Sequence, residues 1–491
     1  MTLRRLAGAA LLVGGLLAVS STSAHAVTLE AVLRASARHH PELIAARKKV
    51  QARLGKLLAS RGAFDPKLAL DAGAAPVGPY GAWLAGVGVA QQTRRGGVAW
   101  KGGYRVGADH PVYTGKQVTS DAGEVYVQVG VPLWRGRAID PARASLRRAE
   151  LQAEAEAERL RAKALALLEK AGLAWIKWRV AAAKQQVEAE LYALAERRAR
   201  QLNVRAQRGL VAELVAVDNA RLLASRRERL LAARQASVAA ALKLSLYFRD
   251  AAGLPSTPTA TADGVGPPPE LEAPTELAPE ASAQEIAAAT EARPEPRVAK
   301  LAVAAAGIDI ALADNDRAPQ LDLLLDASYG LGESQPYGAA ELAKSGPKAA
   351  ARLSLAWPWP QRKARGSAAA ARADADAARA MGQLWRERIA VELRTAHTAL
   401  AAARERMREA RRAAEAAHAL EQAEWRRFDL GQVDLVVVNL REVATADAAA
   451  KAATAWGDLQ AARLRLMAAN GRLLAWLGVE APAQRAAMPK K

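Results

Sequence analysis

The sequence contains no cysteine and few aromatic residues. Among its 491 residues, Phe, Trp and Tyr together make up 4%. Without cysteine no disulfide can form, so the folded chain must be held by packing or by assembly with other chains. Lipid attachment through a cysteine behind a signal peptide is excluded as well. Alanine is prominent among the apolar 51% of residues, which favours long, closely packed helices over a bulky globular core.

Motifs for catalysis or metal binding are also missing. The six histidines do not occur at the spacing of a His-Glu-x-x-His zinc site, and no Ser-His-Asp arrangement is indicated. The glycine pairs Gly96-Gly97 and Gly102-Gly103 lie in predicted strands and not ahead of a helix, which argues against a phosphate-binding loop. The sequence therefore predicts a protein that is not an enzyme and that uses no cofactor and no metal.

Long apolar runs are missing from the chain except at its N-terminus. There, a basic start precedes an apolar run from Leu6 to Val19 and the tripeptide Ala24-His25-Ala26. This order is typical of a secretory signal peptide with an Ala-x-Ala cleavage site, which predicts a signal peptide over residues 1–26 and a mature, exported chain. A membrane anchor is the other interpretation, but the run falls short of the ~20 residues that a spanning helix needs.

Basic residues outnumber acidic ones and give a formal net charge of +20. Such an excess is common in proteins that bind nucleic acid. Here arginine is interleaved with glutamate along predicted helices, as in Glu196-Arg197-Arg198, and is not massed in one block. Together with export, this pattern favours solvent-exposed helical faces over nucleic-acid binding. Attraction to acidic lipid headgroups or to an anionic cargo is a further interpretation.

The two halves of the chain follow one plan. A passage beginning at Asp65-Pro66 and another beginning at Ala318-Pro319 each predict strands followed by a very long helix. A repeat of this size indicates two structural halves that cannot bury their apolar faces alone. The expected divisions are a first repeat over 27–253 (strands about 66–134, helices about 138–250), a proline-rich linker over 254–283, a second repeat over 284–478 (strands about 319–358, helices about 366–477) and a C-terminal tail over 479–491.

The predicted strands alternate apolar and polar residues. From Val125 to Leu133 every second residue is aliphatic, and the same holds from Leu321 to Leu325. Alternation over about ten residues fits a half-buried soluble strand, and it equally fits a transmembrane strand. Residues 82–108 add an extra hairpin to the first half, and the pattern leaves open whether it joins the other strands or lies beside them.

Four shared strands per chain are too few to close a membrane barrel, because the smallest spanning barrels have about eight. An open sheet edge is not tolerated in lipid, so chains would have to pool their strands, and three chains would supply twelve. Helices about 100 Å long would then continue the tube into water. Trp134, Trp357 and Trp359 lie at strand ends, where they fit either a belt at the lipid headgroups or a core at the joint between sheet and helices.

A series of short motifs runs along the mature chain. They are, in order, Thr28-Leu29-Glu30-Ala31-Val32, His40-Pro41-Glu42-Leu43, Gly62-Ala63-Phe64-Asp65-Pro66, Val131-Pro132-Leu133-Trp134-Arg135-Gly136, Gln361-Arg362-Lys363-Ala364-Arg365-Gly366, Asn439-Leu440-Arg441-Glu442 and Ala469-Asn470-Gly471-Arg472-Leu473. With the repeat, this set resembles the TolC-like outer membrane efflux protein family. The resemblance implies a mainly α fold with membrane β-strands: a trimer whose twelve-stranded β-barrel in the outer membrane is continued by an α-helical barrel in the periplasm.

The same resemblance implies a function and partners. The chain would be the passive exit duct of a tripartite efflux pump or a type I secretion system. It would form a homotrimer in outer membrane lipid, bind no nucleic acid, and be opened by a periplasmic adaptor (membrane fusion) protein and an inner-membrane transporter. The alternative is a soluble periplasmic coiled-coil scaffold or adaptor, although adaptors carry one helical hairpin and this sequence predicts two.

Two sites follow from the resemblance. In the family the helix–turn–helix tips contact the adaptor; the matching positions here are Arg208, Gly209, Leu210, Val211, Leu430, Gly431, Gln432 and Val433. Ordinary interhelical turns are the other interpretation. Some members ring the periplasmic entrance with aspartates just after the second tip, where this chain has Val436-Val437-Val438, which favours a hydrophobic constriction. The gate candidates, whose charged members also fit solvated surface groups, are Asp429, Asp434, Val437, Leu440, Arg441, Glu213 and Asp218.

Overall fold

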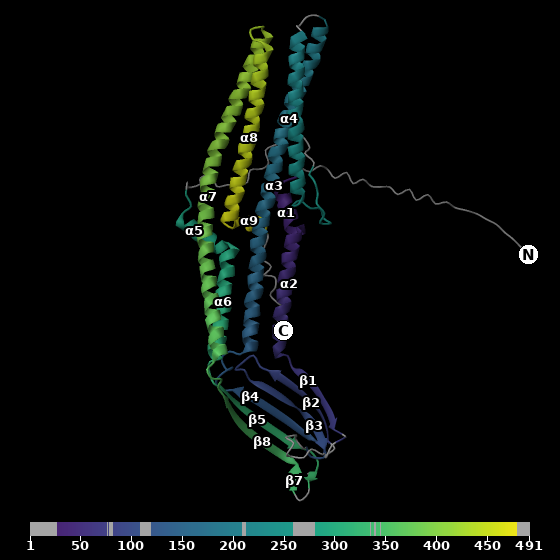
Figure 1. Ribbon diagram of the computed structural model, residues 1–491, viewed down its shortest axis with the longest axis vertical. Helices are drawn as coiled ribbons and strands as arrows, with labels where there is room; N and C mark the ends of the chain where they lie inside the picture. Colours follow the sequence, from purple (N-terminus) through teal and green to yellow (C-terminus); the bar gives the residue numbers. More distant parts are fainter. Residues whose placement is uncertain are drawn as a thin grey trace, which may run out of the picture.

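The molecule is an elongated shaft of helices with a β-sheet at one end (Figure 1). The computed structural model describes residues 27–75, 77, 82–108, 119–208, 213–258, 280–333, 335–337, 340–343 and 345–478. The expected signal peptide, most of the proline-rich linker and the C-terminal tail lie outside the described residues. The expected combination of long helical hairpins and antiparallel strands is confirmed.

Two helices precede the sheet, α1 (Leu29–His39) and α2 (Pro41–Arg61). The Thr28 hydroxyl oxygen accepts a hydrogen bond from the Ala31 amide at 3.2 Å and caps α1. His40 separates the helices, and its Nδ1 accepts the Glu42 amide at 3.2 Å. Pro41 occupies the first turn of α2, where its missing N–H has no intrahelical partner to lose. A single 3₁₀ turn, η1 (Gly62–Phe64), then leads into the sheet.

Two long helical hairpins form most of the shaft. The first consists of α3 (Pro141–Gln207) and α4 (Glu213–Ser245), and the second of α7 (Arg362–Asp429) and α8 (Leu435–Ala469). With 67 residues, α3 is about 100 Å long. Both hairpins turn at the end of the molecule away from the sheet (Figure 1). Across the described ranges, no helix contains an apolar stretch long enough to cross a membrane.

The sheet-side halves of the two longest helices, α3 and α7, are each packed by shorter helices. In the first half this is α2 against α3; in the second, α5 (Ala283–Ala292) and α6 (Pro294–Asn315) lie against α7. A last short helix, α9 (Arg472–Trp476), follows Gly471, which adopts a φ of 75° that favours glycine. Alanines buried at one- and two-turn spacing allow helices of the second half to lie close; they are Ala299, Ala306, Ala313, Ala364, Ala368, Ala371 and Ala375.

The main sheet contains six antiparallel strands in the order β1 (Lys67–Ala75), β2 (Ala82–Gln92), β3 (Ala99–Ala108), β4 (Glu124–Pro132), β5 (Gln320–Gly330) and β8 (Gly346–Ala356). β4 of the first half pairs with β5 of the second, which joins the halves edge to edge. A small separate pair is formed by β6 (Gln335–Tyr337) and β7 (Ala340–Ala343).

The extra hairpin of the first half is β2–β3, and it lies within the main sheet between β1 and β4. The main sheet therefore contains six strands, which are the four shared by the two halves and the two of the extra hairpin. The sequence had left open whether residues 82–108 pair with the other strands. Their pairing is continuous, from Trp83 opposite Ala108 to Gln92 opposite Ala99.

Candidate functional site

The two faces of the main sheet differ sharply in polarity. Directly opposed residues point to the same side of a sheet, so the pairing register assigns each side chain to a face. We call the first the apolar face. Apart from Gln91 its residues are aliphatic, aromatic, glycine or proline, and many are exposed, including Leu68, Leu70, Val87, Val125, Val127, Leu325, Leu353 and Leu355. Leu70, for example, is 82% exposed.

The opposite face, here called the polar face, carries every charged residue of the six main strands. These residues are Lys67, Asp71, Lys101, Arg105, Glu124, Asp322, Asp326, Lys348 and Arg352. Glu124 on β4 lies within 2.5 Å of Arg105 Nε on β3 and 3.6 Å from Lys348 Nζ on β8, so the charges are linked across strands. A sheet with one exposed apolar face and one charged face suits a wall between lipid and water.

Aromatic residues mark both ends of the apolar face. The predicted belt residues Trp134, Trp357 and Trp359 follow the helix-side ends of β4 and β8 and are between 56% and 79% exposed. They do not fill a core in this chain, so the core interpretation is wrong; a place at the lipid headgroups stays a prediction. Sequence reasoning missed Trp83 and Trp100, which point to the same face, and their place in strands that alternate with small residues was the available signal.

The helix tips lie at the far end of the shaft (Figure 1). Between α7 and α8 the chain reverses at Leu430, Gly431 and Gln432, all exposed, with Gly431 at a φ of 71°. Glycine is favoured there because a Cβ would be strained at positive φ. At the first tip Arg208 is exposed, whereas Gly209, Leu210 and Val211 lie outside the described residues. Val433 is half-buried beside the second turn.

The gate candidates are scattered over the two tips and are not brought into one cluster. Asp429 and Asp434 are exposed at the end of α7 and the start of α8. Asp218 is exposed and pairs with Arg221 at 2.9 Å, and Arg441 lies 3.8 Å from Glu424. Leu440 is 66% exposed, Val437 is half-buried, and Glu213 begins α4.

A buried ionic cluster next to these candidates was not expected from the sequence. Glu442 on α8 accepts from Arg198 on α3 and from Arg226 on α4, the latter at 3.0 Å. The Arg198 guanidinium also lies over the Trp425 ring of α7, 4.9 Å from its centroid. All four long helices therefore meet here. Burial lowers the pKa of Arg226 from its usual value, and the neighbouring Glu442 carboxylate opposes that shift.

The ionic cluster continues one turn further along the shaft. Arg229 on α4 contacts Glu188 on α3 at 2.9 Å and Asp447 on α8 at 2.7 Å. Hydrogen bonding to Asp447 raises the pKa of Arg229. The first hairpin is thus tied to the second through charged groups near the tips. The charges were visible in the sequence, but nothing there separated them from the solvated arginines around them.

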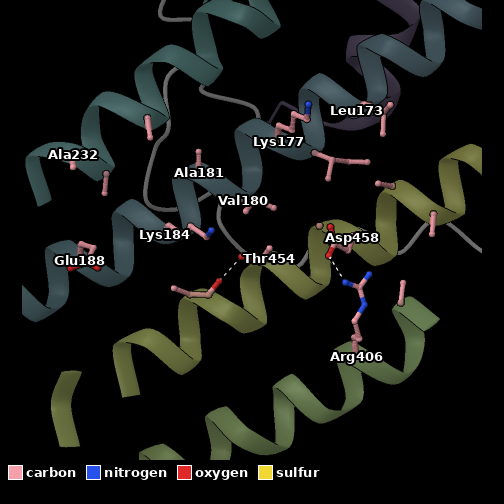
Figure 2. Close-up of a pocket in the computed structure, with 18 of the residues that line it drawn as sticks. Leu173, Lys177, Val180, Ala181, Lys184, Glu188, Ala232, Arg406, Thr454 and Asp458 are labelled. Atoms are coloured by element: carbon pink, nitrogen blue, oxygen red, sulfur yellow. Dashed lines mark hydrogen bonds and ion pairs between the residues drawn. The ribbon is translucent and has the colours of Figure 1, made fainter. Parts of the chain in front are cut away.

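A cavity of about 720 Å³ opens between the hairpins below the ionic cluster. Figure 2 shows Lys177, Lys184 and Glu188 on one side and Thr454 and Asp458 on another. Asp458 forms an ion pair with Arg406 of α7 at 3.3 Å. Among the described residues, no group of three or more His, Asp and Glu side chains is arranged to hold a metal ion.

Comparison with solved structures decides the fold. The chain matches the outer-membrane channel OprN with 18% identity and a TM-score of 0.62 over 90% of this chain and 89% of that one. It matches the CmeC outer membrane channel of Campylobacter jejuni with 14% identity and a TM-score of 0.62 over 90% and 85%. It matches the MtrE outer membrane channel of Neisseria gonorrhoeae in its open state with 15% identity and a TM-score of 0.61, over 90% of this chain and 88% of that one.

The chain has the TolC-like outer-membrane channel fold. No family model and no curated protein sequence matches it, so the likeness is one of structure. The two hairpins of this chain lie side by side along the shaft, and two glycines set the distance between them (Figure 1). A Cβ at Gly457 on α8 would overlap Val180 on α3, and one at Gly172 on α3 would overlap Leu464 on α8. Larger residues at these positions would push the two hairpins apart.

Proposed function

We propose that this chain is the outer membrane channel of a tripartite efflux pump or a type I secretion system. It acts as a passive exit duct, carries out no chemistry, and forms a homotrimer whose sheets pool into one barrel. The observation that carries this proposal is the separation of charge in the main sheet. Every charged residue of its six strands points to one face, and the opposite face is exposed and apolar. Burying that face in lipid removes a large apolar surface from water.

The membrane placement can be tested by fractionation. We expect the protein to leave the outer membrane fraction only with detergent, and to appear as heat-labile trimers on mildly denaturing gels. Release by osmotic shock would instead support a soluble periplasmic scaffold. Purely monomeric protein in detergent, by crosslinking and by sizing, would contradict the trimeric duct.

Channel activity has its own test. Purified protein added to a planar lipid bilayer should give discrete conductance steps. In a host that lacks its own exit duct, export of a fluorescent pump substrate should return only when the cognate adaptor and inner-membrane transporter are supplied with this chain. Failure to export with intact conductance would limit the proposal to a channel without this pump partnership.

The adaptor is proposed to contact the helix tips. The exposed turn at Leu430, Gly431 and Gln432 supports this, because an exposed leucine at a helix end offers an apolar anchor. Leu430→Asp should lower export and co-purification of the adaptor without changing conductance. Leu420→Asp, at a residue on the side of α7 that is also exposed, is the matched control and should leave export unchanged. The gate candidates Asp429, Asp434 and Arg441 are proposed to act on the periplasmic entrance, at the same end of the shaft as the helix tips.

A further inference from the structure

The hairpin β2–β3 has the same two faces as the rest of the main sheet. On β2 the apolar face carries Trp83, Ala85, Val87 and Val89, of which Val87 is 44% exposed. The polar residue Gln91 also points to this face, but it lies at the helix-side end, where its amide donates to the Phe64 carbonyl at 2.9 Å. A hairpin that projected into water would have no reason to keep an exposed apolar face in line with its neighbours.

On β3 the alternation is the same. Trp100, Tyr104 and Val106 point to the apolar face, whereas Lys101 and Arg105 point to the polar face. Tyr104 lies just past the middle of the strand, and its hydroxyl donates to the Ala122 carbonyl at 2.7 Å. Both strands have the length of their neighbours, at 11 and 10 residues, which matches the ~9–11 residues of a tilted membrane strand.

A strip of glycines, Gly86, Gly88 and Gly103, lies in the middle of the hairpin's polar face. Gly103 on β3 packs so closely against the β2 backbone at Val87 and Gly88 that no side chain fits there. The Tyr126 ring of β4 covers this strip: its hydroxyl would lie 3.0 Å from a Cβ at Gly88, and the Arg105 guanidinium lies 4.7 Å from the ring centroid. The hairpin therefore adds wall to the sheet, and along this glycine strip it adds little bulk to the side that would face the lumen.

The edges of the sheet determine how copies can join. In the part of the chain that the structure describes, β1 and β8 each pair with a single neighbour and form the two edges. Every pairing within the sheet is antiparallel and the number of strands is even, so β1 and β8 run in opposite directions. The β8 edge of one copy can therefore pair antiparallel with the β1 edge of the next, and the same contact repeats until the ring closes.

We propose that β2 and β3 are membrane-spanning strands and that three copies of this chain close an eighteen-stranded barrel. The proposal deepens the proposed channel function and rests on it. Barrel diameter grows roughly linearly with strand number, so this barrel would be about half as wide again as one built from four strands per copy. The sheet edges would be occupied by second and third copies of the chain, and the apolar face by lipid acyl chains.

The experiment uses single cysteines, which is direct because the chain has none of its own. Val87→Cys and Ala90→Cys probe the two faces of β2, and Val127→Cys and Gln128→Cys are the matched pair on β4. Trimers are reconstituted into phosphatidylcholine vesicles and treated with a water-soluble maleimide. In a second set a fluorophore on each cysteine is exposed to bromine-labelled phosphatidylcholine, which quenches only groups in contact with acyl chains.

We expect Val87→Cys and Val127→Cys to be quenched by the labelled lipid and to react slowly with the maleimide. Ala90→Cys and Gln128→Cys should behave in the opposite way. If the β4 pair alternates while both β2 positions react with the maleimide and escape quenching, the hairpin lies outside the membrane and the inference is overturned, with the channel function intact. If the β4 pair also fails to alternate, the channel proposal itself fails.

The strand number can be read directly from electron cryomicroscopy of the trimer in lipid nanodiscs. Eighteen strands in the barrel cross-section are expected. Twelve strands in a trimer, with β2–β3 folded outside the wall, would overturn the inference. A dimeric particle with twelve strands would overturn it as well, because it would show that two copies are enough to close the sheet.

Discussion

Arg226 on α4 and Glu442 on α8 meet in the buried ionic cluster, with Nη2 3.0 Å from Oε2 and side chains 3% and 0% exposed. Glu442 also forms an ion pair with Arg198, so one carboxylate neutralises two buried guanidinium groups. Removing the carboxylate would leave two cations buried with no anion between them. This costs much more folding free energy than the loss of an exposed ion pair.

Glu442→Gln should therefore lower the free energy of unfolding by about 3–5 kcal/mol, as when one partner of a buried pair is removed. The measurement is denaturant unfolding of purified protein in detergent. Asp458→Asn, which breaks the half-exposed pair with Arg406, is the control and should change stability by less than about 1 kcal/mol. Equal effects of the two variants would contradict a buried role for Glu442.

The double variant Glu442→Leu with Arg226→Met should recover part of the loss of unfolding free energy, because an apolar pair leaves fewer buried charges unpaired.

Gly457 sets the contact between the hairpins. Gly457→Ala should destabilise the chain by about 1–3 kcal/mol, because the new methyl group overlaps Val180 on α3. Gly307→Ala on α6 is the matched control: its Cβ would meet nothing within 4 Å, so the higher helix propensity of alanine should stabilise by up to about 1 kcal/mol. Opposite signs in guanidinium unfolding are expected. A stabilising Gly457→Ala would show that the hairpins do not pack at this distance.

His40 should make stability depend on pH. Burial lowers its pKa below 6.5, while the nearby Glu42 opposes the shift and Arg249 adds to it. Below pH 6.5 the unfolded chain takes up a proton that the folded chain resists, so the free energy of unfolding should fall as pH drops from 6.5 toward the folded pKa. His40→Asn keeps a cap acceptor for α2 and should remove this component. His418→Asn, at an exposed position on α7, is the control and should retain the pH dependence of the free energy of unfolding. Unfolding midpoints between pH 5 and 8 provide the comparison.

The two faces of β4 should respond oppositely to charge. Val127→Arg places a guanidinium on the apolar face and should reduce the folded, membrane-inserted fraction by about 2–4 kcal/mol if the position lies near the bilayer centre. Gln128→Arg, one residue further, points to the polar face opposite Asp326 and should be tolerated. Folding into vesicles, followed by gel mobility without heating, measures both. Similar losses in both variants would argue against lipid on the apolar face.

Much of the fold could be predicted from the sequence because its periodicities are strong. The alternation from Val125 to Leu133 predicts β4 within a residue of its observed bounds. The residues of β2 and β3 could be predicted to form strands, but the place of these strands in the sheet could not be predicted. The reason is that glycine occupies positions 86, 88 and 103, where polar side chains would have distinguished one face of the hairpin from the other.

The candidate site was harder to predict. Tip positions follow from a glycine that ends a helix, as Gly431 does, so local sequence carries the signal. The ionic cluster depends on Arg198, Arg226 and Glu442, which are far apart in the chain and meet only because four helices pack. An arginine beside glutamates looks the same in sequence whether water or another helix lies next to it, so burial of these charges could not be read from local pattern.

The two halves of the chain are joined by the β4–β5 ladder at the sheet, while the hairpin tips lie at the opposite end. Because the ionic cluster also ties the hairpins to each other near the tips, the two hairpins of one chain form a single lever whose fulcrum is at the sheet. Over about 100 Å of helix, a rotation of one degree at the fulcrum displaces the tip by about 2 Å. In the channel that we propose, a partner that pushes at the tips would therefore displace them by several ångströms while the strands hardly shear, which would keep the barrel sealed against lipid.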